Sequence, residues 1–353
     1  MIEKDDLRAA VAAGAITEAQ AARILTLSAE RKGHLSAARP DEEPFELFKG
    51  FNEIFIVVGL VILAAGWAGV STAAALTGFN NVFGLIVARS LVAAGIIWAL
   101  SEYFIRRRRM VAPAITLTIF WALNTTLGFS ASYAEPFMVA QQDWSSTIIP
   151  LALASGALLL YWVRFRVPFA LALVAIGIFI LITVSLAVQA GDPGEISDLF
   201  LLSSEGPFAL ATLLFGVGVF AVAMWFDMSD PHRVTRRASN GFWLHVVAAP
   251  AIVNTVALTL ITSEAPGARL ALVVFLGALA LVAIVIDRRS FLIAAVGYVV
   301  ALSAQLEEGM GIATLILLLG VVLVLLGAFW ERIRGVLMGM LPFLPRAKLP
   351  PVG

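Results

Sequence analysis

Residues 54–77 read IFIVVGLVILAAGWAGVSTAAALT and contain no charged residue. A helix needs roughly 20 residues to cross a hydrocarbon core about 30 Å thick, so this stretch is long enough to span a membrane. Comparable stretches recur as far as residue 330. Over the whole chain 60% of the residues are hydrophobic and 14% are charged, whereas soluble domains are about 25% charged. The sequence therefore predicts an all-α, polytopic integral membrane protein.

Ten segments of this kind are predicted to be transmembrane helices. They cover residues 54–77, 83–105, 111–133, 146–163, 167–190, 207–226, 242–262, 269–286, 290–305 and 311–330. We take residues 51–334 as the transmembrane domain. Residues 335–353 are taken as a cytosolic tail, and its proline-rich part, residues 341–353, is expected to be flexible or to lie on a surface.

The distribution of basic residues predicts the topology. If the even-numbered segments end in the cytosol, 22 of the 24 Lys and Arg residues lie on the cytosolic side, and the outer loops are mainly acidic. The two exceptions are Arg89, inside the second segment, and Arg269, at the outer start of the eighth. The positive-inside rule then places both termini in the cytosol. Frequent Ala and Arg with little Lys suggests a bacterial genome, so we expect a multi-pass protein of the bacterial cytoplasmic (inner) membrane.

Residues 1–32 have a different character and predict a cytosolic helical hairpin. Gly14 suits the end of a first helix, and Thr17 with Gln20 forms a capping-box pattern at the start of a second. Two helices this short bury little surface on their own, so we expect a partner surface: the membrane domain, a second copy of the chain or another protein. Residues 33–50 are read as a linker and an interfacial lead-in to the first span.

The N-terminal 70 residues resemble a known group of proteins. The pattern of residues 7–25, the linker, and the sequence GFNEIF at residues 50–55 ahead of many spans resemble a bacterial family of predicted polytopic membrane proteins of unknown function. Members of that family combine a cytosolic helical hairpin with a polytopic domain. The resemblance is specific over about the first 70 residues and implies no catalytic residue.

Weak internal similarity suggests a duplicated membrane domain. Asn124 and Thr125 in the third segment match Asn254 and Thr255 in the seventh. Further matches occur between the segments that follow the third and those that follow the seventh. We therefore favour two parallel four-helix repeats, made of segments three to six and seven to ten. A division into five plus five segments with inverted topology explains the helix count equally well, although we find no residue matches for it.

Polar side chains inside the predicted spans are the candidates for a substrate path. Arg89 lies roughly 10 Å from the outer end of its helix at 1.5 Å per residue; it either snorkels or pairs with Glu135 or Asp143, or it attracts anions in an outward-facing cavity. Asn124 and Asn254 lie near mid-depth. They either hydrogen-bond between helices or form a polar lining shared by two repeats.

Two residues of the seventh segment complete the candidate set. Pro250 removes one backbone hydrogen bond a turn before Asn254 and is expected to kink the helix, at a place where a carrier would use a broken helix. His245 lies near the cytosolic end beside Phe242 and Trp243, which favours interfacial packing over a role in proton relay.

The chain shows no sign of catalytic chemistry. It has no cysteine and three scattered histidines, and it lacks phosphate-binding, zinc-protease and nucleophile-elbow motifs. We therefore expect no enzyme activity, no metal, no cofactor and no nucleic-acid partner. Two functions remain open. The membrane domain is a carrier or channel for a small or amphipathic solute, or it is a scaffold or sensor that recruits partners or oligomerises through its hairpin.

Overall fold

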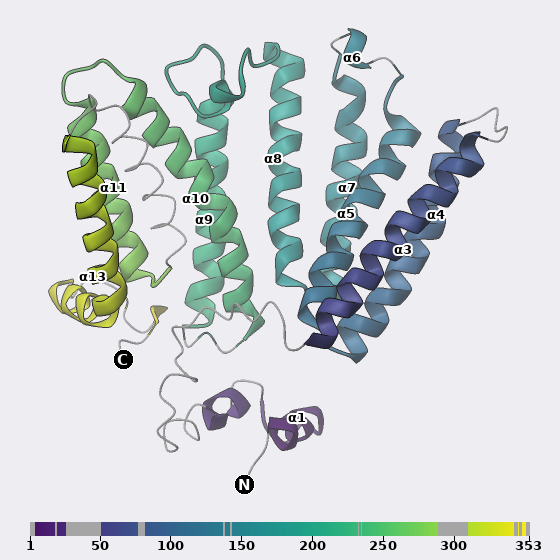
Figure 1. Cartoon of the computed structure of the whole chain (residues 1–353), viewed down its shortest axis with the longest axis horizontal. Coiled ribbons are helices and arrows are strands. Elements are labelled where there is room, and N and C mark those ends of the chain that lie inside the picture. Colours follow the sequence, from purple (N-terminus) through teal and green to yellow (C-terminus); the bar gives the residue numbers. More distant parts are fainter. Residues whose placement is uncertain are drawn as a thin grey trace. The chain divides into compact units, whose positions relative to one another are not determined.

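The structure is a computed structural model, and helices account for its regular structure (Figure 1). It describes residues 4–17, 20–25, 51–76, 82–136, 138–141, 143–231, 233, 235–288, 310–341, 345 and 348–350. No β-strand occurs among these residues. The predicted linker and the predicted ninth span lie outside them.

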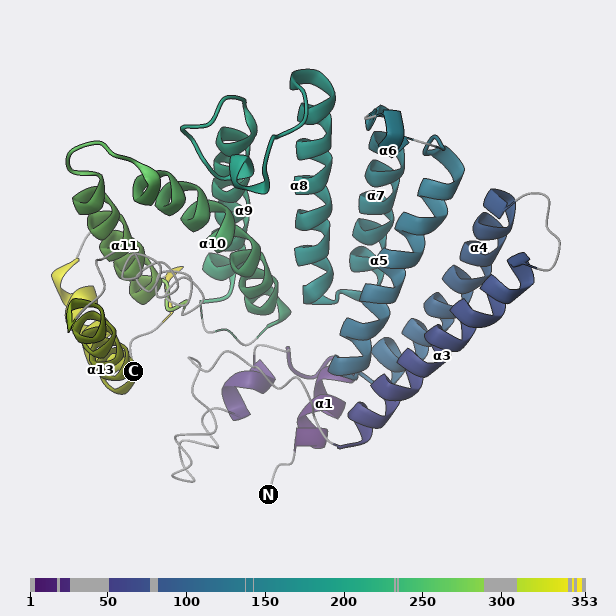
Figure 2. The same ribbon diagram turned by 45° about the horizontal axis from the view of Figure 1, so that its top comes forward.

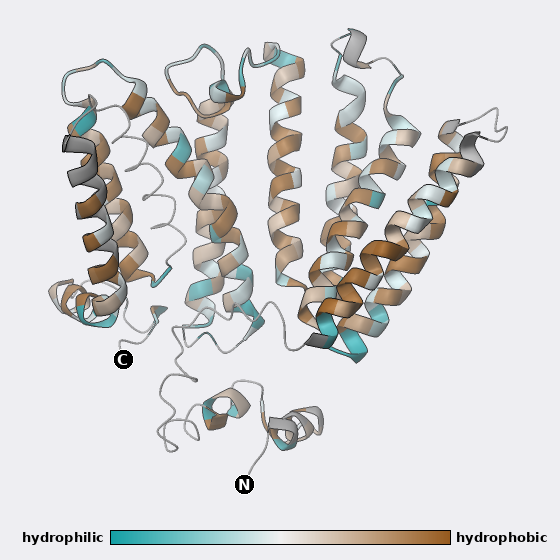
Figure 3. Ribbon diagram, in the orientation of Figure 1, coloured by the Kyte–Doolittle hydropathy of each residue, from teal (hydrophilic) through white to brown (hydrophobic). Residues whose placement is uncertain are grey.

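Eight of the described helices are long and apolar enough to cross a membrane. They are α3 (Phe51–Leu76), α4 (Val82–Ser101), α5 (Val111–Tyr133), α7 (Ile148–Phe165), α8 (Pro168–Ala190), α9 (Phe208–Ser229), α10 (Arg236–Thr262) and α11 (Ala268–Val285). Hydrophobic residues run along the lengths of α8 and α11 (Figure 3). The first eight predicted spans thus correspond to eight helices, and the protein is membrane-embedded with multiple spans.

The chain divides into two compact units. Unit 1 comprises residues 1–45, 200–203 and 216–353, and unit 2 comprises residues 46–199 and 204–215. Unit 2 therefore holds α3 to α8, and most of α9 belongs with α10 and α11 in unit 1. The predicted four-helix repeat of segments three to six does not coincide with either unit, and the two repeats remain a prediction.

The core of unit 2 is built around α5, which packs against α3, α4 and α7 (Figure 2). Trp121 of α5 stacks on Tyr161 of α7, with ring centroids 5.4 Å apart, and its indole N–H donates to the Ala157 carbonyl at 3.1 Å. The Tyr161 hydroxyl is 2.7 Å from the Ser101 hydroxyl at the end of α4. Large aromatic side chains fill this core, and their polar atoms bond across helices.

The turn from α4 into α5 has its own supports. A π-helical turn, Glu102–Arg107, follows α4, and the α5 helix begins at Val111. The buried Glu53 side chain on α3 accepts a hydrogen bond from the Ala112 backbone N–H at 3.0 Å. A carboxylate at this point satisfies a free N–H group and complements the positive end of the α5 dipole.

In unit 1, α10 packs closely against α9 and α11. A Cβ at Gly216 of α9 would lie 2.9 Å from the Ala251 Cβ, so a glycine permits this approach. The α13 helix (Met310–Met340) contains the tenth predicted segment, and Phe329 interrupts its helical geometry. The helix continues to Met340, which is part of the predicted cytosolic tail, and Leu349 is buried in a cluster with Val285 and Met338.

The predicted hairpin is described in part. Helix α1 (Lys4–Ala12) is followed by Gly14 in the left-handed region, at φ +71°, and residues 20–25 are helical. The Thr17 N–H donates to the Gln20 side chain at 2.8 Å, and the Gln20 N–H donates to the Thr17 hydroxyl at 3.2 Å. The predicted capping box is therefore confirmed in both of its hydrogen bonds.

Candidate functional site: a buried ion network in unit 1

Arg89 and Asn124, predicted as substrate-path candidates, both join α4 to a neighbouring helix of unit 2. The Arg89 guanidinium donates to the Ser71 hydroxyl of α3 at 3.2 Å, rather than to the predicted partners Glu135 or Asp143 among the described residues. The Asn124 amide donates to the Ser90 carbonyl at 2.9 Å. The Asn124 contact is an interhelical hydrogen bond, one of the two alternatives predicted for this residue, whereas the contact of Arg89 with Ser71 was not predicted.

The candidates of α10 lie in unit 1. Asn254 is partly buried, and Thr255 beside it is fully buried and donates to the Ala251 carbonyl at 2.7 Å. The α10 helix runs continuously through Pro250, whose side chain is exposed, and the kink expected at this position stays a prediction. Because Asn124 and Asn254 belong to different units, a lining shared between them stays a prediction.

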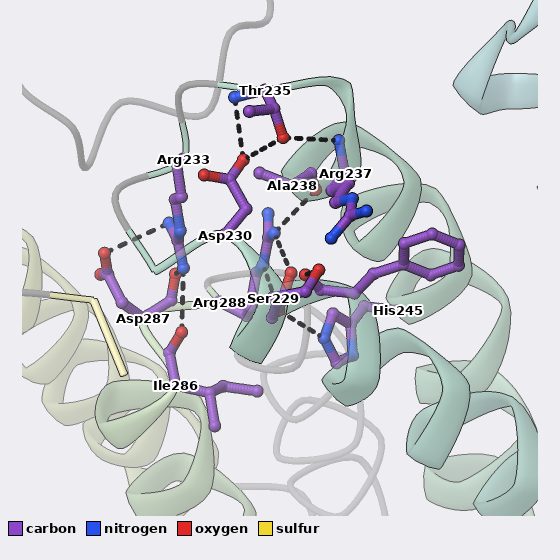
Figure 4. Close-up of polar contacts among 12 residues, drawn as sticks. Ser229, Asp230, Arg233, Thr235, Arg237, Ala238, His245, Ile286, Asp287 and Arg288 are labelled. Atoms are coloured by element: carbon purple, nitrogen blue, oxygen red, sulfur yellow. Dashed lines mark hydrogen bonds and ion pairs between the residues drawn. The ribbon is translucent and has the colours of Figure 1, made fainter. Parts of the chain in front are cut away.

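A buried polar network in unit 1 combines one predicted candidate, His245, with residues that were not predicted as candidates (Figure 4). Asp227, on the last turns of α9, faces Arg288, which follows α11, and both side chains are buried. Arg288 binds the carboxylate with two parallel hydrogen bonds, from Nε to Oδ2 at 3.0 Å and from Nη2 to Oδ1 at 2.6 Å. The same Nη2 also donates to the Ala238 carbonyl of α10 at 2.9 Å. This bidentate geometry is the strongest form of ion pair that an arginine makes.

His245 of α10 belongs to the same network. Its side chain is fully buried, its Nε2 lies 2.9 Å from Asp227 Oδ2, and the Phe220 ring packs against it. The sequence favoured interfacial packing for His245. In the structure the ring is buried inside the unit, and its partner is the carboxylate of Asp227, 18 residues earlier on the adjacent helix.

A second ion pair extends the network to α13. Arg233 donates to the backbone carbonyls of Ile286 and Asp287 at 2.9 and 2.7 Å, and its Nη1 lies 3.2 Å from Asp287 Oδ2. The other oxygen of Asp287 accepts from the Trp330 indole N–H at 2.7 Å. Both side chains of the Arg233–Asp287 pair are at most 5% exposed. The cytosolic ends predicted for α9, α10 and α11 are thus joined to α13 by buried charges.

Two local features position these groups. Asp230 accepts from both the backbone N–H and the hydroxyl of Thr235, which in turn caps the first turn of α10. Gly241 of α10 leaves room for the Asp227 carboxylate, because a Cβ there would overlap Oδ1 and lie 3.0 Å from Cγ. Helix capping and a glycine therefore bring the α10 backbone against the ion network.

Sequence reasoning missed the network because its arginines were counted as topology anchors in cytosolic loops. Asp227 follows the predicted end of the sixth segment by one residue, and Asp287 follows that of the eighth by one residue. The available signal was the presence of Asp227, Asp230 and Asp287 at a basic end of the domain, where the positive-inside rule requires no carboxylate.

Comparisons with known proteins found no match. No family model matches the chain, and no curated protein or solved structure matches it. Among the described residues, no group of three or more His, Cys, Asp or Glu side chains is placed to hold a metal ion. The site and fold therefore define a helical, membrane-embedded protein with a buried ion network, and the resemblance drawn from the hairpin stays a prediction.

Proposed function

We propose that the protein is a carrier for a small or amphipathic solute, and that the Asp227–His245–Arg288 network closes the predicted cytosolic end of unit 1. The observation that carries this proposal is the burial of charged side chains at the ends of three membrane-spanning helices. Ionisable groups inside a membrane domain are costly and are concentrated at functional sites. A carrier has to close and reopen one end of its path, and ion pairs between helix ends supply reversible contacts.

Stability alone is a weak reason to retain such a network. Replacing a buried ion pair with apolar side chains of similar volume is often neutral or stabilising. Removing one partner is different, because it leaves an unpaired buried charge at a cost of about 3–5 kcal/mol. Removal of a single partner is therefore expected to destabilise the arrangement in which the helix ends are together. His245, beside the carboxylate, adds a group that can accept or release a proton as the contacts change.

The test uses the absence of natural cysteine in the chain. Asn254→Cys is introduced alone and together with Asp227→Asn, and both variants are treated in sealed vesicles with a membrane-impermeant thiol reagent from each side. We expect slow labelling when the network is intact and at least tenfold faster labelling from the cytosolic side with Asp227→Asn. Tenfold corresponds to about 1.4 kcal/mol, well below the cost of breaking a buried pair.

Two positions serve as controls. Val273→Cys, on an exposed apolar face of α11, should remain unlabelled, and Glu264→Cys, in the loop after α10, should report the outer side. If Asn254→Cys resists the reagent from both sides in both backgrounds, the carrier proposal fails. Labelling at equal rates in both backgrounds would support a water-filled path to Asn254 but would show that the network does not close it.

One observation favours the second candidate, a scaffold or sensor that pairs through its hairpin. The capping box is formed, and Ala13 at the hairpin turn is exposed. In this alternative, Ala13→Cys should crosslink two copies of the full chain in native membranes, and Glu264→Cys, in the loop after α10, should not. Failure of Ala13→Cys to crosslink would contradict pairing through the hairpin.

A further inference from the structure

Exposed arginines gather at one end of unit 2, where two turns between spans lie. Hydrophilic residues at the end of α4 mark this place (Figure 3). The arginines come from the turn between α4 and α5 and from the turn between α7 and α8, and all six are exposed. They are Arg106, Arg107, Arg108, Arg109, Arg164 and Arg166. We call this set the arginine cluster.

One carboxylate joins the two turns. Glu102 binds Arg106 through one oxygen at 3.2 Å and Arg164 through the other at 2.6 Å. The second carboxylate described at this end, Glu53, is 4% exposed and is bonded to the Ala112 N–H. The described residues of this end thus carry six guanidinium groups and two carboxylates, which is a surplus of four positive charges.

The backbone indicates that the arginine side chains themselves matter. Arg109 and Arg166 both have φ +53°, in the left-handed region that favours glycine or asparagine. Arg166 is the residue that ends α7, and its N–H donates to the Trp162 carbonyl at 2.7 Å. A glycine would relieve both turns at no steric cost. Two arginines at strained positions are better explained by what their side chains bind than by the turns.

Three arginines of the cluster lie over aromatic rings, and the two closest contacts are those of Arg166 and Arg108. Arg166 lies over the Trp162 ring, 4.8 Å from its centroid. Arg108 lies over Tyr103 at 5.6 Å and donates to its hydroxyl at 3.2 Å. Tyr and Trp are typical of the membrane–water interface, and stacking on a ring orients a guanidinium while leaving most of its N–H donors available.

We propose that the arginine cluster binds the headgroup of an anionic phospholipid. The guanidinium fork matches phosphate oxygens, and the ends of membrane-spanning helices lie at the depth of lipid phosphates. Exposed apolar side chains continue from the cluster along α7, where Leu160 and Val163 are 59% and 49% exposed. A lipid thus finds charge for its phosphate and an apolar surface for its acyl chains, which a free phosphate does not use. This inference does not depend on the carrier proposal.

The experiment measures binding of a short-chain fluorescent phosphatidylglycerol to the purified full-length protein in neutral detergent, by fluorescence anisotropy. The test variant is Arg107→Gln with Arg109→Gln, because neither side chain makes an ion pair or hydrogen bond among the described residues. An arginine near an anionic surface contributes about 1 kcal/mol, so we expect about thirtyfold weaker binding. Arg269→Gln, an exposed arginine in the first turn of α11 in unit 1, is the matched control and should change binding by less than twofold.

Arg109→Gly separates binding from folding. It should weaken phosphatidylglycerol binding about fivefold, while thermal stability stays equal or rises because glycine accepts the left-handed backbone. The proposal is overturned if phosphatidylcholine binds as tightly as phosphatidylglycerol, or if the double variant binds normally. Inorganic phosphate is tested as a competitor at millimolar concentration. If it displaces the lipid with the same dependence on Arg107 and Arg109, the cluster is a site for free anions and the assignment to a lipid is overturned.

Discussion

Gly241→Ala places one methyl group where the ion network needs space. A Cβ at this position would overlap Asp227 Oδ1 and would lie 3.0 Å from its Cγ and 3.2 Å from the Ala223 carbonyl oxygen. The carboxylate cannot yield without losing alignment, because Arg288 and His245 hold it from two sides. A change that usually favours a helix is therefore expected to destabilise this one.

The magnitude is the balance of two opposing terms. Glycine to alanine in a helix interior is favourable by about 1 kcal/mol. Disrupting a buried, hydrogen-bonded ion pair costs about 3–5 kcal/mol. The free energy of unfolding should therefore fall by about 2–4 kcal/mol. Equilibrium unfolding of the purified protein in mixed detergent and SDS, followed by tryptophan fluorescence, measures this difference.

Gly218→Ala on α9 is the matched control, since nothing lies within 4 Å of an added Cβ there. It should leave the stability unchanged or raise it by up to about 1 kcal/mol. Repeating Gly241→Ala in an Asp227→Ala background should abolish its penalty, because the clashing atoms are gone. The reasoning is refuted if Gly241→Ala is as stable as Gly218→Ala, or if its penalty survives without the carboxylate.

Three further outcomes are expected. Asn124→Ala, which loses its bond to α4, should lower the free energy of unfolding by about 0.6 kcal/mol and by no more than about 1.7 in the same detergent titration. Trp330→Phe, which leaves one oxygen of buried Asp287 without its donor, should cost about 1.5–3 kcal/mol; a loss below about 0.5 kcal/mol would contradict this contact. Hydrogen bonds from Ser145 hold the pKa of exposed Asp143 below its ordinary value of 3.8, so Ser145→Ala should raise that pKa in a carboxyl-carbon NMR titration. Any stability from this contact is present above pH 3.8 and is lost as the pH falls through the lowered pKa.

Local patterns explain why the helix limits could be predicted. The third span was predicted at residues 111–133, and α5 is Val111–Tyr133. The seventh was predicted from residue 242, but α10 begins at Arg236, because Thr235 caps its first turn and makes two bonds to Asp230. A hydropathy pattern cannot reveal that a polar turn is helical when the side chain that supports it comes from the turn after the preceding helix.

By itself the sequence determined that the chain is helical and embedded in a membrane, and that a capped helix start near Thr17 precedes the membrane domain. These properties arise from transfer energies that add along a continuous stretch and from bonds between residues three positions apart. Only the tertiary structure decided that Asp227 meets Arg288, 61 residues later, and that some of the arginines predicted to lie in cytosolic loops are buried in an ion network while others are exposed. Charge and hydropathy are the same for a solvated arginine and a buried one. The difference arises from which helix ends pack together, and no local pattern in the chain encodes that packing.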